Sequence, residues 1–121
     1  NIMALSTDIM RGGFSSGAAR AIQGQANGAL AAAGTTQATA TLIAQSIVAV
    51  TSGTGGVRLP SGNIGDEVEV LNLNTADITI YPPTSEQINN LAANAGFLLG
   101  QYTAVKVKKF TATRWMGFLS A

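Results

Sequence analysis

The sequence contains no cysteine and no histidine. Without these residues the chain can form no disulfide framework, no thiolate nucleophile and no Ser-His-Asp or Cys-His pair, and it lacks the ligands of ordinary zinc and haem sites. Most hydrolases and metalloenzymes are excluded on this ground. We therefore expect no enzyme activity, no catalytic residue, no bound metal and no cofactor.

Charge and aromatic residues are also scarce. Of the 121 residues, 11% are charged and 6% aromatic, although 46% are hydrophobic, and the formal net charge is +1. An average soluble domain carries about 25% charged residues. The place of the missing charge is taken by Ala, Gly, Thr, Ser and Asn, which are acceptable in buried contacts between chains. This composition favours a subunit of an assembly, and the near-zero net charge would not attract nucleic acid or an anionic membrane.

Long hydrophobic runs are absent as well. The longest uninterrupted apolar stretches, such as 47–50 and 96–100, are far shorter than the roughly 20 residues that cross a bilayer. The first residues, with Asp8 before Arg11, do not have the pattern of a secretory signal. We expect no membrane-spanning segment.

The composition changes near residue 37 and divides the chain into two parts. Residues 1–37 are rich in Ala and Gly and contain one aromatic residue, so they cannot bury enough apolar area to fold alone. We interpret them as an N-terminal arm that orders against a neighbouring subunit; a flexible leader is the alternative. Apolar side chains concentrated in its first third are the expected contacts: Ile2, Met3, Leu5, Ile9, Met10 and Phe14.

Residues 38–121 have the patterns of a β domain. The segment 38–51 is apolar on both alternating faces, which predicts a strand covered on two sides or one split by a bend at Gln45. A hairpin is expected from residues 66–74 and 77–81. The further strands that the sequence predicts are 57–59, 96–99, 102–111 and 113–119. About seven short strands and no long helix indicate an all-β fold: a jelly-roll-like sandwich first, another Greek-key sandwich or a small barrel as the alternative.

The charges that are present form two blocks of opposite sign. Asp66, Glu67 and Glu69 could in principle bind calcium, but on a strand Glu67 and Glu69 share one face while Asp66 points to the other. We interpret them as a charged strand edge. Lys106, Lys108 and Lys109 form a basic strip that is too small for nucleic-acid binding. We expect the two blocks to align one chain with another copy or with a partner shell.

Two further features have structural interpretations. Gly53 and Gly55 begin a glycine-rich stretch that lacks the third glycine and the lysine of a phosphate loop, so they are interpreted as turn residues with positive φ. Trp115, the single tryptophan, has Met116, Phe118 and Leu119 nearby. It is predicted to anchor the core, with a ligand platform as the alternative.

The stretch from Val50 to Leu119 resembles a module of small structural proteins of tailed bacteriophages. The resemblance rests on VTSGTGGVRLP, IGDEVEVLN, ITIYPPTSEQINNLAANAGFLL and VKVKKFTATRWMGF, in that order, over about 70 residues. Asn90 stands where the module often has glycine after Ile-Asn. Modules of this kind occur in capsid cement or decoration proteins and in fibre-like virion parts.

The resemblance implies a structural protein of the virion. We expect the chain to bind the outside of a bacteriophage capsid and to stabilise it by bridging subunits of the major capsid protein. Other copies of the chain, as dimers or trimers at capsid symmetry axes, are further expected partners, and nucleic acid and membranes are not. The alternative is a head- or tail-fibre module, an adhesin that binds a host receptor or another virion protein.

Overall fold

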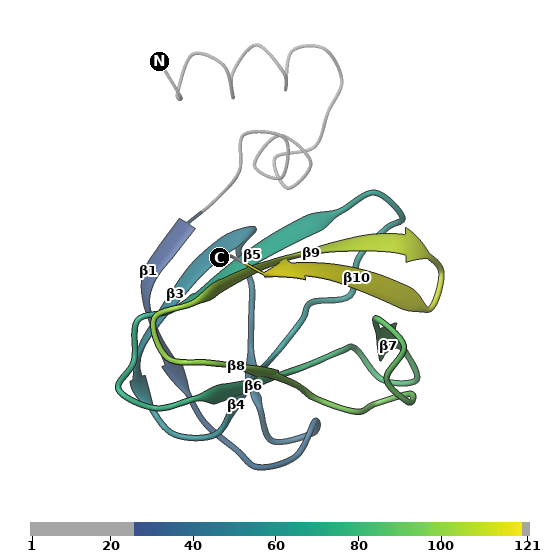
Figure 1. The fold of residues 1–121 in the computed structure, drawn as a ribbon. Helices are drawn as coiled ribbons and strands as arrows, with labels where there is room; N and C mark the ends of the chain where they lie inside the picture. The colour runs from purple at the N-terminus through teal and green to yellow at the C-terminus, as the bar shows by residue number, and fades with distance from the viewer. Residues whose placement is uncertain (1–25, 120–121) are drawn as a thin grey trace, which may run out of the picture.

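The computed structural model describes residues 26–119, and these form two β-sheets with no helix (Figure 1). The all-β class predicted from the sequence is therefore confirmed. The large sheet has the spatial order β1 (Ala26–Ala32), β3 (Ile47–Gly53), β5 (Glu67–Asn72), β9 (Ala104–Thr111), β10 (Arg114–Leu119) and β7 (Gln87–Ile88). The small sheet has the order β2 (Thr41–Leu42), β4 (Gly56–Arg58), β6 (Ile78–Tyr81) and β8 (Phe97–Leu99).

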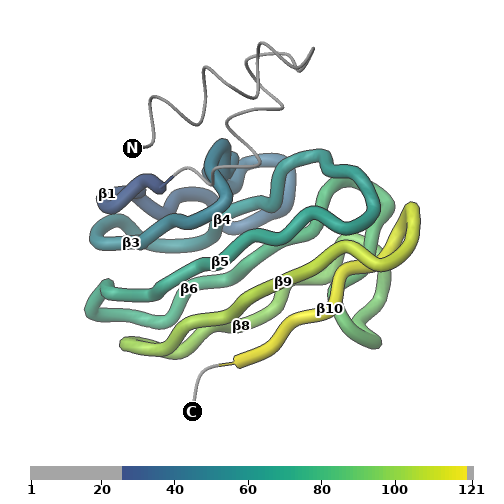
Figure 2. Tube along the Cα trace, turned by 90° about the horizontal axis from the view of Figure 1, so that it is seen from above, coloured from purple at the N-terminus to yellow at the C-terminus, as the bar shows by residue number. Residues whose placement is uncertain are grey.

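From β1 to β6 the chain alternates between the two sheets. We call each large-sheet strand together with the small-sheet strand that follows it a coil. The chain places β1, β3 and β5 side by side in the large sheet and β2, β4 and β6 side by side in the small sheet, all in parallel pairs. Seen from above, each coil lies next to the one before it, from β1 towards β5 and β6 (Figure 2). Successive large-sheet strands therefore start at one end of the molecule, the same end at which the small-sheet strands finish.

The direction of the chain reverses after β6. β8 pairs antiparallel with β6, β9 pairs antiparallel with β5, and β10 forms a hairpin with β9. The short strand β7 pairs in parallel with the first two residues of β10. This last part of the chain closes one side of the two coiled sheets (Figure 1).

The predicted jelly roll is not confirmed. A jelly roll is built of antiparallel strands, whereas five of the eight strand pairs here are parallel. The strands also lie in two separate sheets and not in one closed barrel. The predicted hairpin of 66–74 with 77–81 is wrong, because β5 lies in the large sheet and β6 in the small one.

Two strands were not predicted. β1 lies inside the stretch assigned to the N-terminal arm, so at least residues 26–32 of that stretch belong to the large sheet. β7 lies between the predicted strands 77–81 and 96–99, where no strand was predicted. The segment 38–51 is split into β2 and β3 with bends at Gln45 and Ser46, so of the two interpretations of this segment the split is confirmed.

The core lies between the inner faces of the two sheets. Alternate residues of each strand point into it, as the period of two along a β-strand requires. From the large sheet come Val48, Val50, Val68, Val70, Val105, Val107 and Trp115, and from the small sheet Val57, Ile78, Ile80 and Leu99. The β-branched side chains that dominate this set pack well on pleated surfaces.

Glycines allow neighbouring coils to approach closely where the chain turns from one sheet to the other. Gly53 has a φ of 81°, and a Cβ at this position would lie 2.0 Å from the carbonyl oxygen of Ala32 in the preceding coil. Gly55 also has a positive φ, of 106°. The interpretation of these glycines as turn residues is confirmed.

A buried asparagine holds the turn between β5 and β6. The Asn72 side chain is fully buried, and its Nδ2 donates to the carbonyls of Ala76 at 2.9 Å and Leu99 at 3.1 Å. Its Oδ1 accepts from the backbone N–H of Asn74 at 3.0 Å, and Asn74 Nδ2 donates to the carbonyl of Gly53 at 2.8 Å. These bonds connect the turn after β5 to the last residues of β3 and β8, and they satisfy polar groups that water cannot reach.

Candidate interaction surface

The second half of β10 exposes apolar side chains on both of its faces. Phe118 is 58% exposed and Leu119 is 59% exposed. Phe118 pairs with Lys106 on the outer face of the large sheet, while Leu119 pairs with the inward-pointing Val105. β10 is the next strand after β9 in the large sheet, whereas the small sheet ends at β8, so no small-sheet strand covers Leu119 (Figure 2). Together with Met116, these residues form what we call the β10 surface.

The backbone edge of β10 is also only partly paired. β7 covers Arg114 and Trp115, and the next contact on this side is the N–H of Gly117, which donates to Asn89 Oδ1 at 2.8 Å. Beyond Gly117, no strand within residues 26–119 pairs with this edge. An apolar strand with an open edge is a common site of association between chains.

Other exposed large apolar residues are distributed over the described part of the molecule. They are Leu42, Ile47, Ile64, Leu73, Leu98, Tyr102 and Phe110. Single exposed apolar side chains of this kind are normal on a protein surface. The β10 surface differs because its three side chains lie within four consecutive residues of one edge strand.

The acidic and basic blocks have partners within the chain. β5 and β9 are adjacent, and their register places Glu67 opposite Lys108 and Glu69 opposite Lys106. Lys108 Nζ lies 3.5 Å from Glu67 Oε1, and both side chains are nearly half exposed. We had expected these four side chains to act between chains; in the free chain each already lies opposite a charge of the other sign.

Lys109 is not on the surface, which corrects its assignment as a contact residue. It is only 6% exposed, and its Nζ lies 3.0 Å from Glu86 Oε1 and 2.9 Å from the carbonyl oxygen of Gly62. The period of two along β9 places Lys109 on the same face as Val105 and Val107. That alternation was available in the sequence and would have found the burial of Lys109.

Asp66 holds a turn. Its carboxylate accepts a hydrogen bond from the N–H of Asn63 at 2.8 Å, and its backbone carbonyl accepts one from the N–H of Lys109 at 3.0 Å. Glu67 and Glu69 lie on the outer face of β5, so the three carboxylates do not converge. Across residues 26–119, no group of three or more side chains is placed to hold a metal ion.

Trp115 is fully buried and belongs to the core, as predicted. Its Nε1 donates to Glu86 Oε1 at 2.9 Å, and Lys109 Nζ lies 5.8 Å from the centroid of its ring. Sequence reasoning did not find Glu86 as the partner of both side chains. The available signal was that a buried tryptophan N–H needs an acceptor.

The remaining predicted contacts lie outside the described residues. These are Ile2, Met3, Leu5, Ile9, Met10 and Phe14. Their assignment to an arm that contacts a neighbouring subunit stays a prediction. The described residues contain no helix long and apolar enough to cross a membrane.

Comparison with known proteins does not assign the chain to a family. No protein-family model matches it, and no curated protein matches it.

Proposed function

We propose that the chain is a structural virion protein that binds the outside of a bacteriophage capsid and stabilises it by bridging subunits of the major capsid protein. The observation that carries this proposal is the β10 surface, where Phe118 and Leu119 are exposed on opposite faces of one edge strand. The resemblance of residues 50–119 to modules of phage structural proteins supports the proposed location on the outside of the capsid. Other copies of the chain are the second class of partner.

The energetics suit a lattice of repeated weak contacts. Fully burying a leucine or phenylalanine side chain contributes about 1.5 to 3 kcal/mol. A patch of three apolar side chains therefore gives modest affinity to one contact, and two or three contacts per oligomer increase the overall affinity by avidity. Pairing of the charged residues within the chain leaves apolar burial as the main source of binding energy.

The proposal is tested with phage particles that were assembled without the protein. Wild type and Phe118→Asp are added to these particles, and the bound protein is quantified after sedimentation. Because a charge cannot be buried without a partner, we expect binding of Phe118→Asp to be at least about tenfold weaker. Ile64→Asp is the matched control, since Ile64 is 65% exposed and lies outside the β10 surface.

Capsid stability is the second measurement. Particles that carry wild-type protein should resist heat or low ionic strength better than bare particles, and Phe118→Asp should not provide this protection. Failure of the wild-type protein to bind particles would contradict the proposal, and equal binding of both variants would remove the β10 surface from it.

One observation favours the fibre alternative. Tyr102 is 68% exposed in the turn between β8 and β9 and has a φ of 58°. An exposed aromatic ring at a loop tip suits a glycan or a protein receptor. Loss of host adsorption in a phage that carries Tyr102→Ala, with normal capsid stability, would support this second function over the first.

A further inference from the structure

The outer face of the large sheet turns away from the core and carries exposed apolar side chains (Figure 1). Ile47 on β3 is 42% exposed, and Met116 and Phe118 on β10 are 36% and 58% exposed. Their positions alternate with those of the buried Val48 and Trp115, so all three side chains point outward. Within residues 26–119 no strand packs over this face, because the small sheet lies against the inner one.

The strand register aligns the outward side chains in rows that run across the sheet. The first row consists of Ile47, Glu69, Lys106 and Phe118. The second row consists of Glu67, Lys108 and Met116. In both rows the acidic side chain lies on β5 and the basic one on β9, and these are the two central strands of the six. The face therefore has an acidic and a basic stripe side by side at its middle, with apolar side chains outside them.

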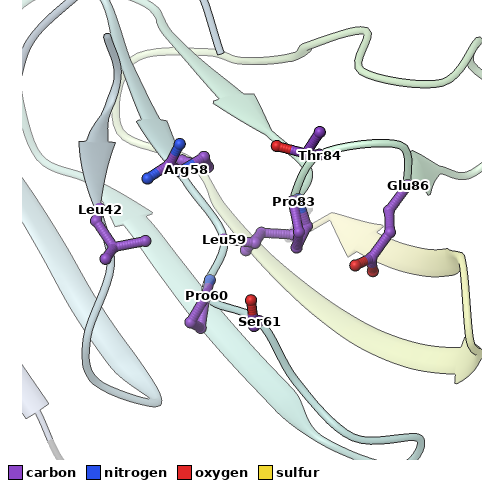
Figure 3. Close-up of a pocket in the computed structure, with 8 residues that line it drawn as sticks. All are labelled: Leu42, Arg58, Leu59, Pro60, Ser61, Pro83, Thr84 and Glu86. Carbon is purple, nitrogen blue, oxygen red and sulfur yellow. The ribbon is translucent and has the colours of Figure 1, made fainter. Parts of the chain in front are cut away.

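The other charged side chains of the described part do not belong to these two rows. They are Arg58, Asp66, Asp77, Glu86, Lys109 and Arg114. Arg58 and Glu86 line a groove of about 480 Å³ at the end of the small-sheet strands β2 and β4 (Figure 3). Lys109 points inward to Glu86. The middle of the outer face thus carries only the two stripes.

A two-fold axis makes this face complementary to itself. The axis runs parallel to the strands between β5 and β9, and it places the outer face of a second copy over the first. Three strands lie on each side of this axis, so β5 of one copy lies over β9 of the other, β3 over β10 and β1 over β7. The position along the strands does not change under this rotation. Each row of one copy therefore faces the same row of the other, in the opposite order.

The contacts across this axis are both charged and apolar. In the first row, Glu69 of one copy faces Lys106 of the other, and Ile47 faces Phe118 at both ends of the row. Each charge keeps its neighbour of opposite sign within its own sheet and gains a second one across the interface, so none is unpaired when water is excluded. A two-fold axis across the strands would instead place β5 over β5 and bring carboxylates together. Charge therefore selects the axis that is parallel to the strands.

The size of the face fits a weak dimer. Six strands at a spacing of about 4.8 Å and six residues at about 3.3 Å give a face of roughly 25 by 20 Å. Two such faces bury about 1,000 Å² in total, which is at the lower limit for a specific interface. We expect a dissociation constant of about 10 to 100 μM. The apolar contacts supply most of the affinity, and the charges set the orientation.

We infer that two copies of the chain form a two-fold dimer through the outer faces of their large sheets, with the acidic stripe of each copy over the basic stripe of the other. This inference deepens the proposed function, on which it rests for the high local concentration of copies on a capsid. In the dimer Phe118 is covered by the second copy, whereas Leu119 on the opposite face of β10 stays available to the capsid.

The first test is sedimentation velocity of the isolated full-length chain over a range of concentrations around the expected dissociation constant. An acidic variant carries Lys106→Glu and Lys108→Glu, and a basic variant carries Glu67→Lys and Glu69→Lys. Each alone should dimerise at least about tenfold more weakly than wild type, because like charges then face each other. An equimolar mixture of the two should recover the wild-type affinity to within about threefold. Like charges still lie opposite each other within each chain, so this recovery can arise only between chains.

Apolar variants test the ends of the row in the same experiment. Ile47→Asp should weaken the dimer at least about tenfold, because its carboxylate would face Phe118 of the second copy. Leu98→Asp is the matched control, since Leu98 is 63% exposed on β8 of the small sheet. It should dimerise like wild type. Circular dichroism confirms that each variant is folded.

The second test locates the contact. The chain has no cysteine, so Ile47→Cys and Phe118→Cys each introduce a single thiol. In a mixture of the two variants the thiols lie about 10 Å apart across the interface, and a short bismaleimide should link them. In either variant alone the two equivalent thiols are about 17 Å apart, so linkage should be much less efficient.

Three outcomes would overturn the inference. One is a wild-type chain that stays monomeric at every concentration. Another is a mixture of acidic and basic variants that dimerises as weakly as each variant alone. The third is cross-linking that is as efficient within one cysteine variant as in the mixture. Because both tests use the isolated chain, a monomer that still binds capsids contradicts only this inference, and a dimer that does not bind them contradicts only the proposed function.

Discussion

Lys109 and Glu86 form a buried ion pair, with 3.0 Å between Nζ and Oε1 and side-chain exposures of 7% and 14%. Lys109 lies on β9, and Glu86 precedes β7. The same carboxylate oxygen accepts the indole N–H of Trp115. One acidic side chain therefore connects β9, β10 and the segment before β7 at the end of the molecule where the last hairpin closes.

Removal of Lys109 should be costly. Lys109→Met leaves the Glu86 carboxylate without its cation in a nearly buried position, which should lower the free energy of unfolding by about 3 to 5 kcal/mol. Lys108→Met is the matched control, because the Lys108–Glu67 pair is nearly half exposed and should contribute only about 0 to 1 kcal/mol. Urea unfolding followed by circular dichroism measures both. Equal losses of unfolding free energy in the two variants would show that the Lys109–Glu86 pair contributes no more to stability than the Lys108–Glu67 pair.

The ring of Trp115 and its N–H should make separate contributions to the stability of the fold. Trp115→Phe keeps most of the ring but removes the hydrogen bond to Glu86, so we expect a loss of about 1 to 3 kcal/mol. Trp115→Ala also opens a cavity and should cost about 3 to 5 kcal/mol. Circular dichroism in urea is the measurement for both, since neither variant keeps the tryptophan fluorescence. If Trp115→Phe is as stable as wild type, the bond to Glu86 contributes nothing.

The alternation of apolar residues made the strand positions and the buried faces predictable, but not the partners of the strands. Val68 and Val70, or Val105 and Val107, could be placed on one face because a strand has a period of two. The parallel coil could not be predicted, because this period is the same for every neighbour and sheet. β1, with the sequence ANGALAA, has no β-branched residue, and its extended form depends on pairing with β3.

The interaction surface could not be predicted from the sequence either, because it too depends on which strands lie next to one another. The exposure of Phe118 depends on where the small sheet ends, and the opposition of Glu67 and Lys108 depends on the register of strands that are far apart in the sequence. Local patterns carry neither kind of information. Burial of Lys109 was within reach of the alternation, whereas its partner Glu86 was not.

Asn72 should be difficult to replace. Asn72→Ala leaves the carbonyls of Ala76 and Leu99 and the N–H of Asn74 without their partner. We expect a loss of roughly 2 to 4 kcal/mol, because buried polar groups without partners are costly. Asn63→Ala is the control, since Asn63 is exposed and bonds through its backbone. It should stay within about 0.5 kcal/mol of wild type. A thermal melt of Asn72→Ala that matches the control would contradict this account of the turn.

Three glycines separate the effects of φ and of space. At Gly65 φ is 98° and a Cβ meets nothing within 4 Å, so Gly65→Ala should cost about 1 to 2 kcal/mol for the left-handed backbone alone. At Gly53 a Cβ would also lie 2.0 Å from the carbonyl oxygen of Ala32, and Gly53→Ala should cost more than about 3 kcal/mol. Gly28→Ala, in open space, should cost nothing. Chemical denaturation measures the loss in free energy of unfolding, which should be largest for Gly53→Ala, smaller for Gly65→Ala and absent for Gly28→Ala. Any other order would contradict the close approach of the coils.

Charge reversal distinguishes pairing within the chain from pairing between chains. In a variant with both Lys106→Glu and Lys108→Glu, like charges lie opposite Glu69 and Glu67, and the isolated chain should lose about 1 kcal/mol at low salt. Adding Glu67→Lys and Glu69→Lys restores opposite charges across the same strands and should restore stability. High salt should reduce both effects, because exposed charges are screened. Unfolding curves of the isolated chains are the measurement. The isolated variant with Lys106→Glu and Lys108→Glu could instead be as stable as the isolated wild type but bind phage particles poorly. In that case the two charge blocks act between chains, as first expected from the sequence.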